Sequence, residues 1–421
     1  MADMASARPG SFRRGDYVKI TIFGFALTAL WQSLHTIILP LRLLDFVPET
    51  QKNTYLGLLT FAGLVLAMLV QPLAGSLSDR FTSAWGKRRP FILYGSLASL
   101  LFLSGIGLPG SFLAIFAVYC LLQISSNTAQ GPYQALIPDL VPPGKRGKAS
   151  GVKSFLEVMG GVALIYPIAL LMDRYFLMKE VRWLWYALGA LALVMLLATL
   201  ATILLVKEAS SQDTKHPFRQ SLKQTFQIDV RKQRDFIWFL VSRLLVLMAF
   251  TTIQQFALNF LRDVIGVASP AEATARFTVI AVAGMLIIVW PAGHLSDSIG
   301  RKPIIIASGI LGAAGISIIL FFQNYEAMLW TAGILGIAIG AFNSTDWALA
   351  TDLLPKNEEA HYLGLTNLAT AGGAALARLI GPLIDYLNKF DGTTGYQVML
   401  LACVIYFLAG SLLVLKIGKT D

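Results

Sequence analysis

The chain has 421 residues, of which 56% are hydrophobic and 14% are charged, and its formal net charge is +10. Soluble domains carry about 25% charged residues, so this composition excludes an ordinary soluble protein. The apolar residues form runs of roughly 20, the length that spans a bilayer core as an α-helix. The sequence therefore predicts an all-α membrane protein that crosses the bilayer many times.

We predict twelve transmembrane helices, and the first of them is too long for a signal peptide and lacks a cleavage site. With the N-terminus inside, 24 Lys and Arg lie in or beside the inner loops and termini and 8 on the outer side. This bias predicts that both termini are cytoplasmic, and it explains the basic charge without nucleic acid. The predicted spans are 17–40, 54–77, 91–108, 112–137, 150–172, 183–206, 237–261, 273–296, 303–322, 327–350, 361–384 and 395–416.

The first span carries three polar or aromatic residues, Trp31, Gln32 and His35. Trp31 and His35 are four residues apart and therefore share one helix face. An aromatic platform under a sugar ring is one interpretation, and a tryptophan anchored near the outer membrane interface is the other. We predict that all three residues contact a substrate.

The span 112–137 has an amide face, since Gln123, Asn127, Gln130 and Gln134 follow one another at spacings of 4, 3 and 4. Polar side chains inside a membrane are costly and mark transport pathways. Amides donate to and accept from sugar hydroxyls, but they also join helices to each other. We predict that Gln123, Asn127 and Gln130 line a cavity, with helix packing as the alternative.

The longest polar stretch, 207–236, is predicted to be a cytoplasmic linker between a six-helix half at 1–206 and another at 237–421. Within it, Phe218, Leu222 and Phe226 recur every four residues. This pattern indicates an interfacial amphipathic helix, and a flexible linker stays open as the alternative.

Three charged residues fall inside predicted spans at a similar depth, namely Glu157, Arg243 and Asp346. An unpaired arginine inside the membrane costs at least about 2.5 kcal/mol. We therefore expect Arg243 to pair with Asp346 or Glu157, and one carboxylate to carry the coupling proton. A permanent structural ion pair is the alternative, and Arg378 could bind substrate or pair with Asp385. Further predicted substrate contacts are Gln254, Asn343 and Trp347.

The chain contains an internal repeat. The segment 75–79 (GSLSD) recurs as GHLSD at 293–297, 218 positions later, and 139–142 (DLVP) recurs as DLLP at 352–355, 213 positions later. The loop after 75–79 is five residues longer than the loop after 293–297, which accounts for the decrease of the offset from 218 to 213. The repeat predicts two six-helix halves related by an axis along the membrane normal.

The segments 75–80 (GSLSDR) and 86–90 (GKRRP), with their second copy at 293–302, resemble the loop signature of the major facilitator superfamily. The resemblance implies two pseudo-symmetric six-helix bundles and a cytoplasmic gate of charged residues. Ordinary solvated loop charges are the alternative. The implied gate residues are Asp79, Arg89, Asp139 and Arg146 in the first half, and Asp297, Arg301 and Asp352 in the second.

Two segments resemble a narrower group, the sucrose/proton symporters, together with the related glycoside–pentoside–hexuronide cation symporters. These are 127–140 (NTAQGPYQALIPDL) and 81–92 (FTSAWGKRRPFI). The resemblance implies a proton- or sodium-coupled glycoside transporter. The chain departs from it at Gln71, where the sodium-coupled branch has acidic residues, and at Tyr133 and Gln134, where the sucrose symporters have an arginine.

These patterns favour a secondary active transporter that takes up a sugar or glycoside with protons by alternating access. Drug or metabolite export by proton antiport is one alternative, and a transporter-like sensor or pigment-assembly factor is another. The four histidines are scattered, both cysteines lie in apolar runs and no phosphate-binding loop is present, so we expect no enzyme, cofactor or metal site. We expect a monomer in a bacterial inner membrane.

Overall fold

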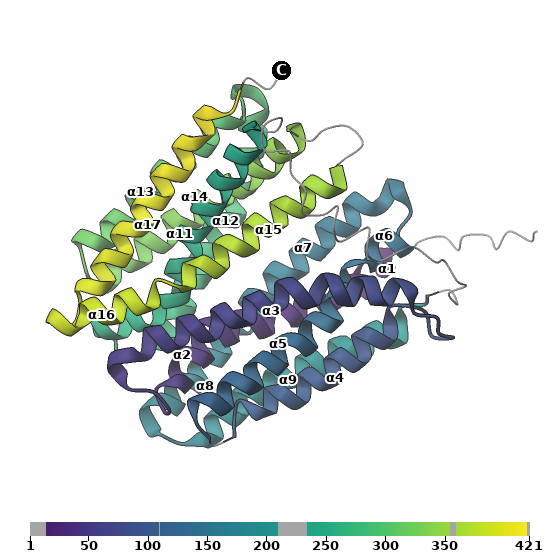
Figure 1. Cartoon of the computed structure of the whole chain (residues 1–421), viewed down its shortest axis with the longest axis horizontal. Coiled ribbons are helices and arrows are strands. Elements are labelled where there is room, and N and C mark those ends of the chain that lie inside the picture. The colour runs from purple at the N-terminus through teal and green to yellow at the C-terminus, as the bar shows by residue number, and fades with distance from the viewer. Residues whose placement is uncertain (1–13, 109, 209–233, 354–358, 419–421) are drawn as a thin grey trace, which may run out of the picture.

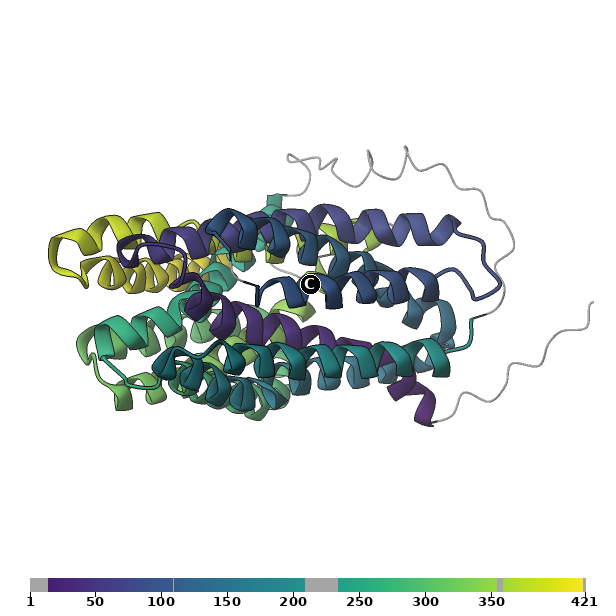
Figure 2. The same cartoon turned by 90° about the horizontal axis from the view of Figure 1, so that it is seen from below.

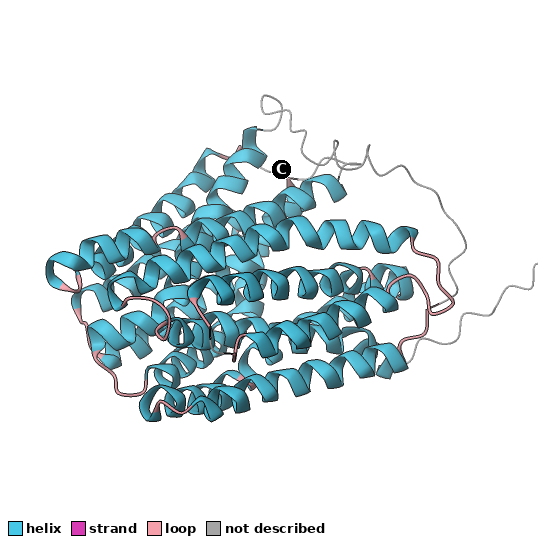
Figure 3. Ribbon diagram, turned by 60° about the horizontal axis from the view of Figure 1, so that its bottom comes forward, coloured by secondary structure: helices cyan, strands magenta, loops and turns pink. Residues whose placement is uncertain are grey.

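The computed structural model describes residues 14–108, 110–208, 234–353 and 359–418, and its regular elements within these ranges are helices (Figure 3). The helices run side by side along the long axis of the molecule (Figure 2). This arrangement confirms the predicted all-α fold. The amphipathic helix predicted at Phe218, Leu222 and Phe226 lies outside the described residues, so the limits of the linker stay a prediction.

The helices up to residue 205 form the lower bundle in Figure 1, coloured purple to blue-green. In chain order they are α1 Arg14–Ser33, continued by the π-helical turn η1 Leu34–Ile38 and by α2 Leu39–Leu43; η2 Glu49–Gln51 and α3 Lys52–Arg80; α4 Arg89–Gly105; α5 Phe112–Gln134 and α6 Leu136–Leu140; η3 Pro143–Lys145, α7 Arg146–Ala163 and α8 Ile165–Met178; and α9 Val181–Leu205.

The helices from residue 234 onward form the upper bundle in Figure 1, coloured green to yellow. They are α11 Arg234–Phe260 with the π-helical turn η4 Leu261–Ile265; α12 Pro270–Ile299; α13 Arg301–Phe321; α14 Tyr325–Asp352; α15 Glu359–Arg378 and α16 Gly381–Asp391; and α17 Thr394–Leu413 with η5 Val414–Lys416.

Eleven segments of the described chain are long and apolar enough to cross a membrane. Each segment is one helix, or two consecutive helices, together with any short turn that continues it. The remaining predicted span, 91–108, corresponds to α4, which has 17 residues and is about 26 Å long. The twelve helices and the cytoplasmic termini are consistent with this structure and stay predictions. Most helices extend beyond the predicted spans, because hydropathy marks only the part of a helix that faces hydrocarbon.

Two membrane-spanning segments are interrupted in corresponding places. Pro167 lies in the first turn of α8 and Pro382 in the first turn of α16. Proline lacks an N–H and its ring clashes with the carbonyl four residues earlier, which kinks or breaks a helix. The second interruption leaves Arg378 as the last residue of α15.

The two bundles are joined at the predicted outer end by two aspartates that cap helices of the opposite bundle. Asp385 of α16 accepts hydrogen bonds from Thr54 N, 2.6 Å away in the first turn of α3, and from Asn53 Nδ2 at 2.9 Å. Asp173 of α8 accepts from the backbone N–H groups of Ala271 and Glu272 at the start of α12, at 3.0 and 2.8 Å. Carboxylates at helix N-termini satisfy unpaired N–H groups and oppose the helix dipole.

Because each aspartate holds a helix of the other bundle, we expect Asp173→Ala and Asp385→Ala each to weaken the contact between the bundles. Both aspartates are 5% exposed, and a buried donor that loses a charged acceptor costs about 1–3 kcal/mol. The midpoint of thermal unfolding in detergent should therefore fall. Asp391→Ala is the control, since within the described residues Asp391 bonds to Thr393 and Thr394 of its own turn and not to the other bundle. Equal midpoints for all three variants would contradict the capping role.

Candidate functional site

A polar cavity of about 160 Å³ lies between the two bundles at the middle of the chain's long helices. Its volume would hold on the order of ten water molecules, which is enough for a small solute. Gln32 and Gln254 touch across it, since Gln254 Nε2 donates to Gln32 Oε1 at 3.3 Å. The lining residues are Thr28, Trp31, Gln32, His35 and Thr36 from the first span, Thr251, Gln254 and Gln255 from α11, and Arg378 from α15.

Four of the predicted substrate contacts therefore share one cavity, namely Trp31, Gln32, His35 and Gln254. The rings of Trp31 and His35 are 5.1 Å apart and tilted by 31°, so they form one aromatic wall. This follows from their spacing of four residues along α1 and η1. Sequence reasoning missed Gln255 as a lining residue, although it is polar and lies in the same apolar span.

The amides of α5 lie behind this wall in a chain of hydrogen bonds. Asn127 Nδ2 donates to Gln123 Oε1 at 3.1 Å, and Gln123 Nε2 donates to the Tyr119 hydroxyl at 2.8 Å. The Tyr119 hydroxyl lies 2.8 Å from His35 Nε2. Gln123 and Asn127, both buried, thus position His35 through Tyr119, a residue that sequence reasoning did not single out.

The other predicted contacts lie apart from the cavity lining. Ser126 of α5 accepts from Trp31 Nε1 at 3.2 Å, whereas Gln130 is half-buried four residues further along that helix. Asn343 and Trp347 of α14 are exposed. The structure thus brings together the residues of the first span and α11, and it leaves those of α14 outside the cavity lining.

Arg378 is the cation of the cavity. Its side chain is buried, with 7% exposed, and its guanidinium donates through Nη1 to the carbonyl of Ala374 in the preceding turn. Asp385, the partner that the sequence left open, is instead bonded to Asn53 and Thr54. Among the described residues that line the cavity there is no Asp or Glu. Arg378 therefore belongs to the site and not to an ion pair with Asp385.

Arg243 of α11 and Asp346 of α14 form an ion pair inside the upper bundle. Asp346 is 1% exposed and Arg243 is 8% exposed. Arg243 Nε also donates to the hydroxyl of Thr370 on α15 at 2.9 Å, and its guanidinium lies 6.0 Å from the ring centre of Trp347. Of the two partners that the sequence left open for Arg243, the structure selects Asp346.

Glu157 lies in the other bundle, on the face of α7 that packs against α1. Its carboxylate is 3.5 Å from Lys153 Nζ, and its side chain is 30% exposed. Its backbone carbonyl accepts from the hydroxyl of Thr28 at 2.7 Å, and Thr28 also lines the cavity. The backbone of Glu157 thus contacts the cavity wall, and its carboxylate is paired with Lys153 and separate from Arg243.

Arg88, and not the predicted Arg89, contacts Asp79 and Asp139, and the gate role of this cluster stays a prediction. Arg88 is 4% exposed. Its guanidinium forms ion pairs with Asp79 and Asp139, and the distance from Nε to Asp139 Oδ2 is 2.9 Å. The guanidinium also donates a hydrogen bond to the hydroxyl of Ser78. Arg89 points the other way and donates to the carbonyl of Ile203. The reason is helical geometry, because neighbouring residues at the start of α4 face directions about 100° apart.

Arg146 bonds to backbone carbonyls in this structure, and its predicted gate role stays a prediction. Its guanidinium donates to the carbonyls of Val141 at 3.1 Å and Pro138 at 2.8 Å, so it stabilises the turn between α6 and α7. These carbonyls are left unpaired where α6 ends, which explains why a cation there bonds to the backbone.

The second half repeats the first cluster around Arg301. Its guanidinium pairs with Asp297 and with Asp352, 3.3 Å away, and donates to Ser296 Oγ at 2.8 Å. The sequence held a signal for the correct arginine, because Arg88 and Arg301 are 213 positions apart, the same offset as Asp139 and Asp352.

The two loops also share one backbone feature, since Gly86 and Gly300 both have φ of +94°. This conformation is strained for residues with a Cβ atom. Gly86 precedes Arg88 by two residues, and Gly300 directly precedes Arg301.

We expect Arg88→Ala to destabilise the protein more than Arg89→Ala, because it leaves two carboxylates without their buried cation. Each charge-assisted hydrogen bond contributes about 1.5–3 kcal/mol. Thermal unfolding in detergent would measure the difference, and Arg88→Lys should restore part of the loss. A larger effect of Arg89→Ala would contradict the conclusion that Arg88 holds this cluster together.

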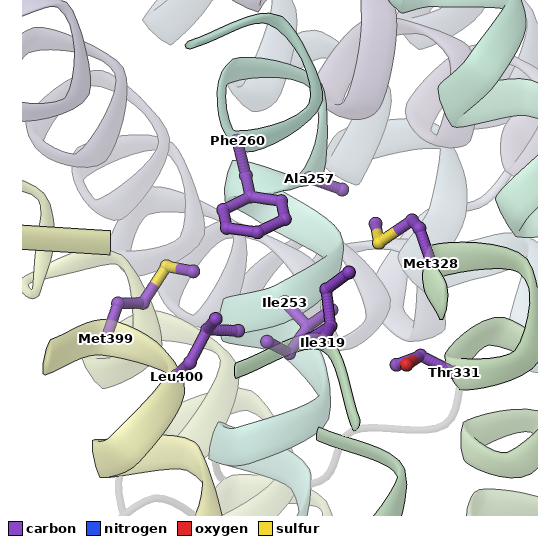
Figure 4. Close-up of a pocket in the computed structure, with 8 residues that line it drawn as sticks. All are labelled: Ile253, Ala257, Phe260, Ile319, Met328, Thr331, Met399 and Leu400. Carbon is purple, nitrogen blue, oxygen red and sulfur yellow. The ribbon is translucent and has the colours of Figure 1, made fainter. Parts of the chain in front are cut away.

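A second crevice lies inside the upper bundle, and Figure 4 shows its apolar walls. Its volume is only about 10 Å³, which leaves room for one water molecule at most. Thr331 is its one polar side chain, and the hydroxyl of Thr331 already donates to the carbonyl of Gly315. This crevice is therefore a packing defect of the bundle and not a solute site. It is lined by Ile253, Ala257, Phe260, Ile319, Met328, Thr331, Met399 and Leu400.

Comparison with known proteins finds short stretches of similarity to two sugar or polyol transporters. The minor myo-inositol transporter IolF of Bacillus subtilis is 28% identical over 116 residues, which are 28% of this chain and 26% of that protein. The sucrose transport protein SUC3 of Arabidopsis thaliana is 30% identical over 132 residues, 26% of this chain and 22% of that protein. The matched part thus spans about a quarter of each relative, and it confirms the predicted resemblance.

A solved structure resembles the fold over nearly the whole chain. It is an inward-facing, unoccupied structure of a bacterial homologue of the human lysosomal transporter Spinster. It has a TM-score of 0.72 at 18% identity and covers 98% of this chain and 100% of that one. The sequence profile of the Major Facilitator Superfamily matches residues 17–377 and, in a second match, 268–420. The chain therefore belongs to the Major Facilitator Superfamily, whose fold is that of membrane transporters and not of enzymes.

Proposed function

We propose that this protein takes up a sugar or glycoside by alternating access, driven by a proton gradient. The observation that carries the proposal is the cavity shared by both bundles, in which Trp31 stands beside the amides of Gln32 and Gln254. Amides bond hydroxyl groups as donors and acceptors, and an aromatic face packs against the apolar face of a sugar ring. The names of the two relatives, a myo-inositol and a sucrose transporter, support the same substrate class.

The transport cycle follows from where the bundles are joined. Asp173 and Asp385 hold them together at the predicted outer end, and Figure 1 displays the bundles diverging toward the end that carries α6 and the C-terminus. With cytoplasmic termini, this arrangement faces inward. Rocking of the bundles around the cavity would open the outer end, and the clusters at Arg88 and Arg301 would brace the inner end when it closes.

We assign proton coupling to the pair of Arg243 and Asp346. In a medium of low dielectric, protonation of Asp346 removes the strongest attraction that Arg243 experiences. Among the described residues, Arg243 then keeps Thr370 and the face of Trp347 as partners, so the packing of α11 against α14 and α15 would change. Glu157 is the second candidate, because its backbone carbonyl bonds Thr28 of the cavity wall and its carboxylate is 30% exposed.

We expect addition of the transported sugar to de-energised vesicles to raise the external pH, because proton and sugar enter together. Asp346→Asn should abolish this alkalinisation while sugar-for-sugar exchange persists, since exchange needs no net proton movement. Loss of coupling in Glu157→Gln alone would move the proton site to Glu157. Acidification with lipophilic cations in energised vesicles, without a response to any sugar, would favour export instead.

We expect Trp31→Ala to raise the KM for uptake about tenfold, equivalent to about 1.4 kcal/mol, because the variant loses the aromatic surface under the sugar. The KM of Trp31→Phe should lie between the KM of Trp31→Ala and that of the wild type. Trp290→Ala is the matched control, since Trp290 is 79% exposed on α12. Uptake of labelled sugar by vesicles measures the effect, and equal KM values for Trp31→Ala and Trp290→Ala would exclude Trp31 from the binding site.

A further inference from the structure

The chain of hydrogen bonds that ends on His35 has one direction, and a backbone carbonyl fixes it. Asn127 Nδ2 donates to the backbone carbonyl of Gln123 at 2.8 Å and to Gln123 Oε1 at 3.1 Å. A carbonyl oxygen only accepts, so the amide of Asn127 has a single orientation. Gln123 Oε1 therefore faces Asn127, and Gln123 Nε2 is the atom that donates to the Tyr119 hydroxyl at 2.8 Å.

The hydroxyl of Tyr119 passes this direction on to His35. Tyr119 is fully buried, and among the described residues its hydroxyl bonds Gln123 and His35. Because the oxygen accepts from Gln123, the hydroxyl hydrogen is left for His35 Nε2, 2.8 Å away. If Nε2 carried a proton, the hydroxyl hydrogen would be buried without an acceptor among the described residues, and such a group is costly. His35 Nε2 is therefore an acceptor.

The other ring nitrogen of His35 is open. His35 lines the central cavity, and its Nδ1 bonds none of the described residues. Nδ1 is also not among the buried polar atoms that lack a partner, so a solute can reach it. A neutral imidazole has one N–H donor and one acceptor. Since Nε2 is the acceptor, the proton is on Nδ1. A second proton would add a cation to a lining that contains Arg378 and, among its described residues, no carboxylate.

We propose that Tyr119 is a positioning residue that fixes the tautomer of His35 with the proton on Nδ1, so that His35 offers a hydrogen-bond donor to the central cavity. The hydrogen bond made by one ring nitrogen determines which form of a histidine is present. The tautomer is a property of the protein alone, whereas its contact with a substrate rests on the proposed function. A solute bound at His35 must then present an accepting oxygen beside the ring of Trp31.

Nitrogen-15 NMR of the purified full chain in lipid bilayers, with labelled histidine, tests the tautomer, because protonated and unprotonated ring nitrogens have well separated shifts. The chain has four histidines, and His35→Asn identifies the signals of His35. We expect the proton on Nδ1 in at least about nine of ten molecules, as one buried hydrogen bond implies. Tyr119→Phe should shift the population severalfold toward Nε2–H, because free histidine favours that form.

Two further variants make this measurement specific. Gln123→Met keeps Tyr119 but removes the donor that orients its hydroxyl, so the fraction of Nδ1–H should also fall. Tyr94→Phe is the matched control, since Tyr94 is 68% exposed on α4, and it should leave the signals of His35 as in the wild type. Wild-type His35 with its proton on Nε2 or on both nitrogens would overturn the proposal. An unchanged tautomer in Tyr119→Phe would overturn it as well.

Uptake by vesicles separates this inference from the proposed function, with labelled myo-inositol and sucrose as the probes. His35→Asn should have a KM about tenfold lower than His35→Gln, because the asparagine amide reaches the place of Nδ1 and the glutamine amide that of Nε2. Equal KM values for the two variants would refute the donor role of His35 while sugar uptake stands. If the wild type transports neither probe, the proposed substrate class is contradicted, and the NMR spectra still decide the role of Tyr119.

Discussion

A charge inside a membrane needs a partner, and the fold of this protein is organised by how each charge obtains one. Arg243 is neutralised by Asp346 from another helix. Arg88 and Arg301 each draw on two aspartates at different helix ends. Since water cannot screen or solvate Arg243 and Asp346 in the bilayer core, their pairing fixes the distance and rotation of α11 and α14.

Some charged contacts occur once in each bundle, whereas the contact of Arg243 with Asp346 occurs in one bundle, and we assign the two kinds of contact different roles. Asp173 and Asp385 are 212 positions apart and cap helices of the opposite bundle in the same way, and the arginine clusters repeat at the other end. Such pairs suit the opening and closing of two equivalent bundles. Arg243 with Asp346 occurs only in the upper bundle, where it offers a single group that proton binding could change.

The cavity lies between the two bundles and is lined by residues of both. Its walls come from the first span, α11 and α15, so its shape depends on how the bundles meet. The hydrogen bond between Gln32 and Gln254 crosses from one bundle to the other, and Arg378 lies at the helix break beside Pro382. A solute bound there touches both bundles at once, which is the geometric requirement for coupling its binding to their movement.

The sequence by itself determined the helices, their order and the internal repeat, because hydropathy and spacing are local properties of the chain. It also contained the offset of 213 that identifies Arg88 as the counterpart of Arg301. Only the tertiary structure decided that Arg243 pairs with Asp346, that Gln123 and Asn127 lie behind the cavity wall, and that Arg378 faces the cavity. The reason is physical, because these outcomes depend on the rotation and depth of helices that are distant in sequence. The local sequence around a polar residue in one span does not determine which neighbouring helix that residue contacts.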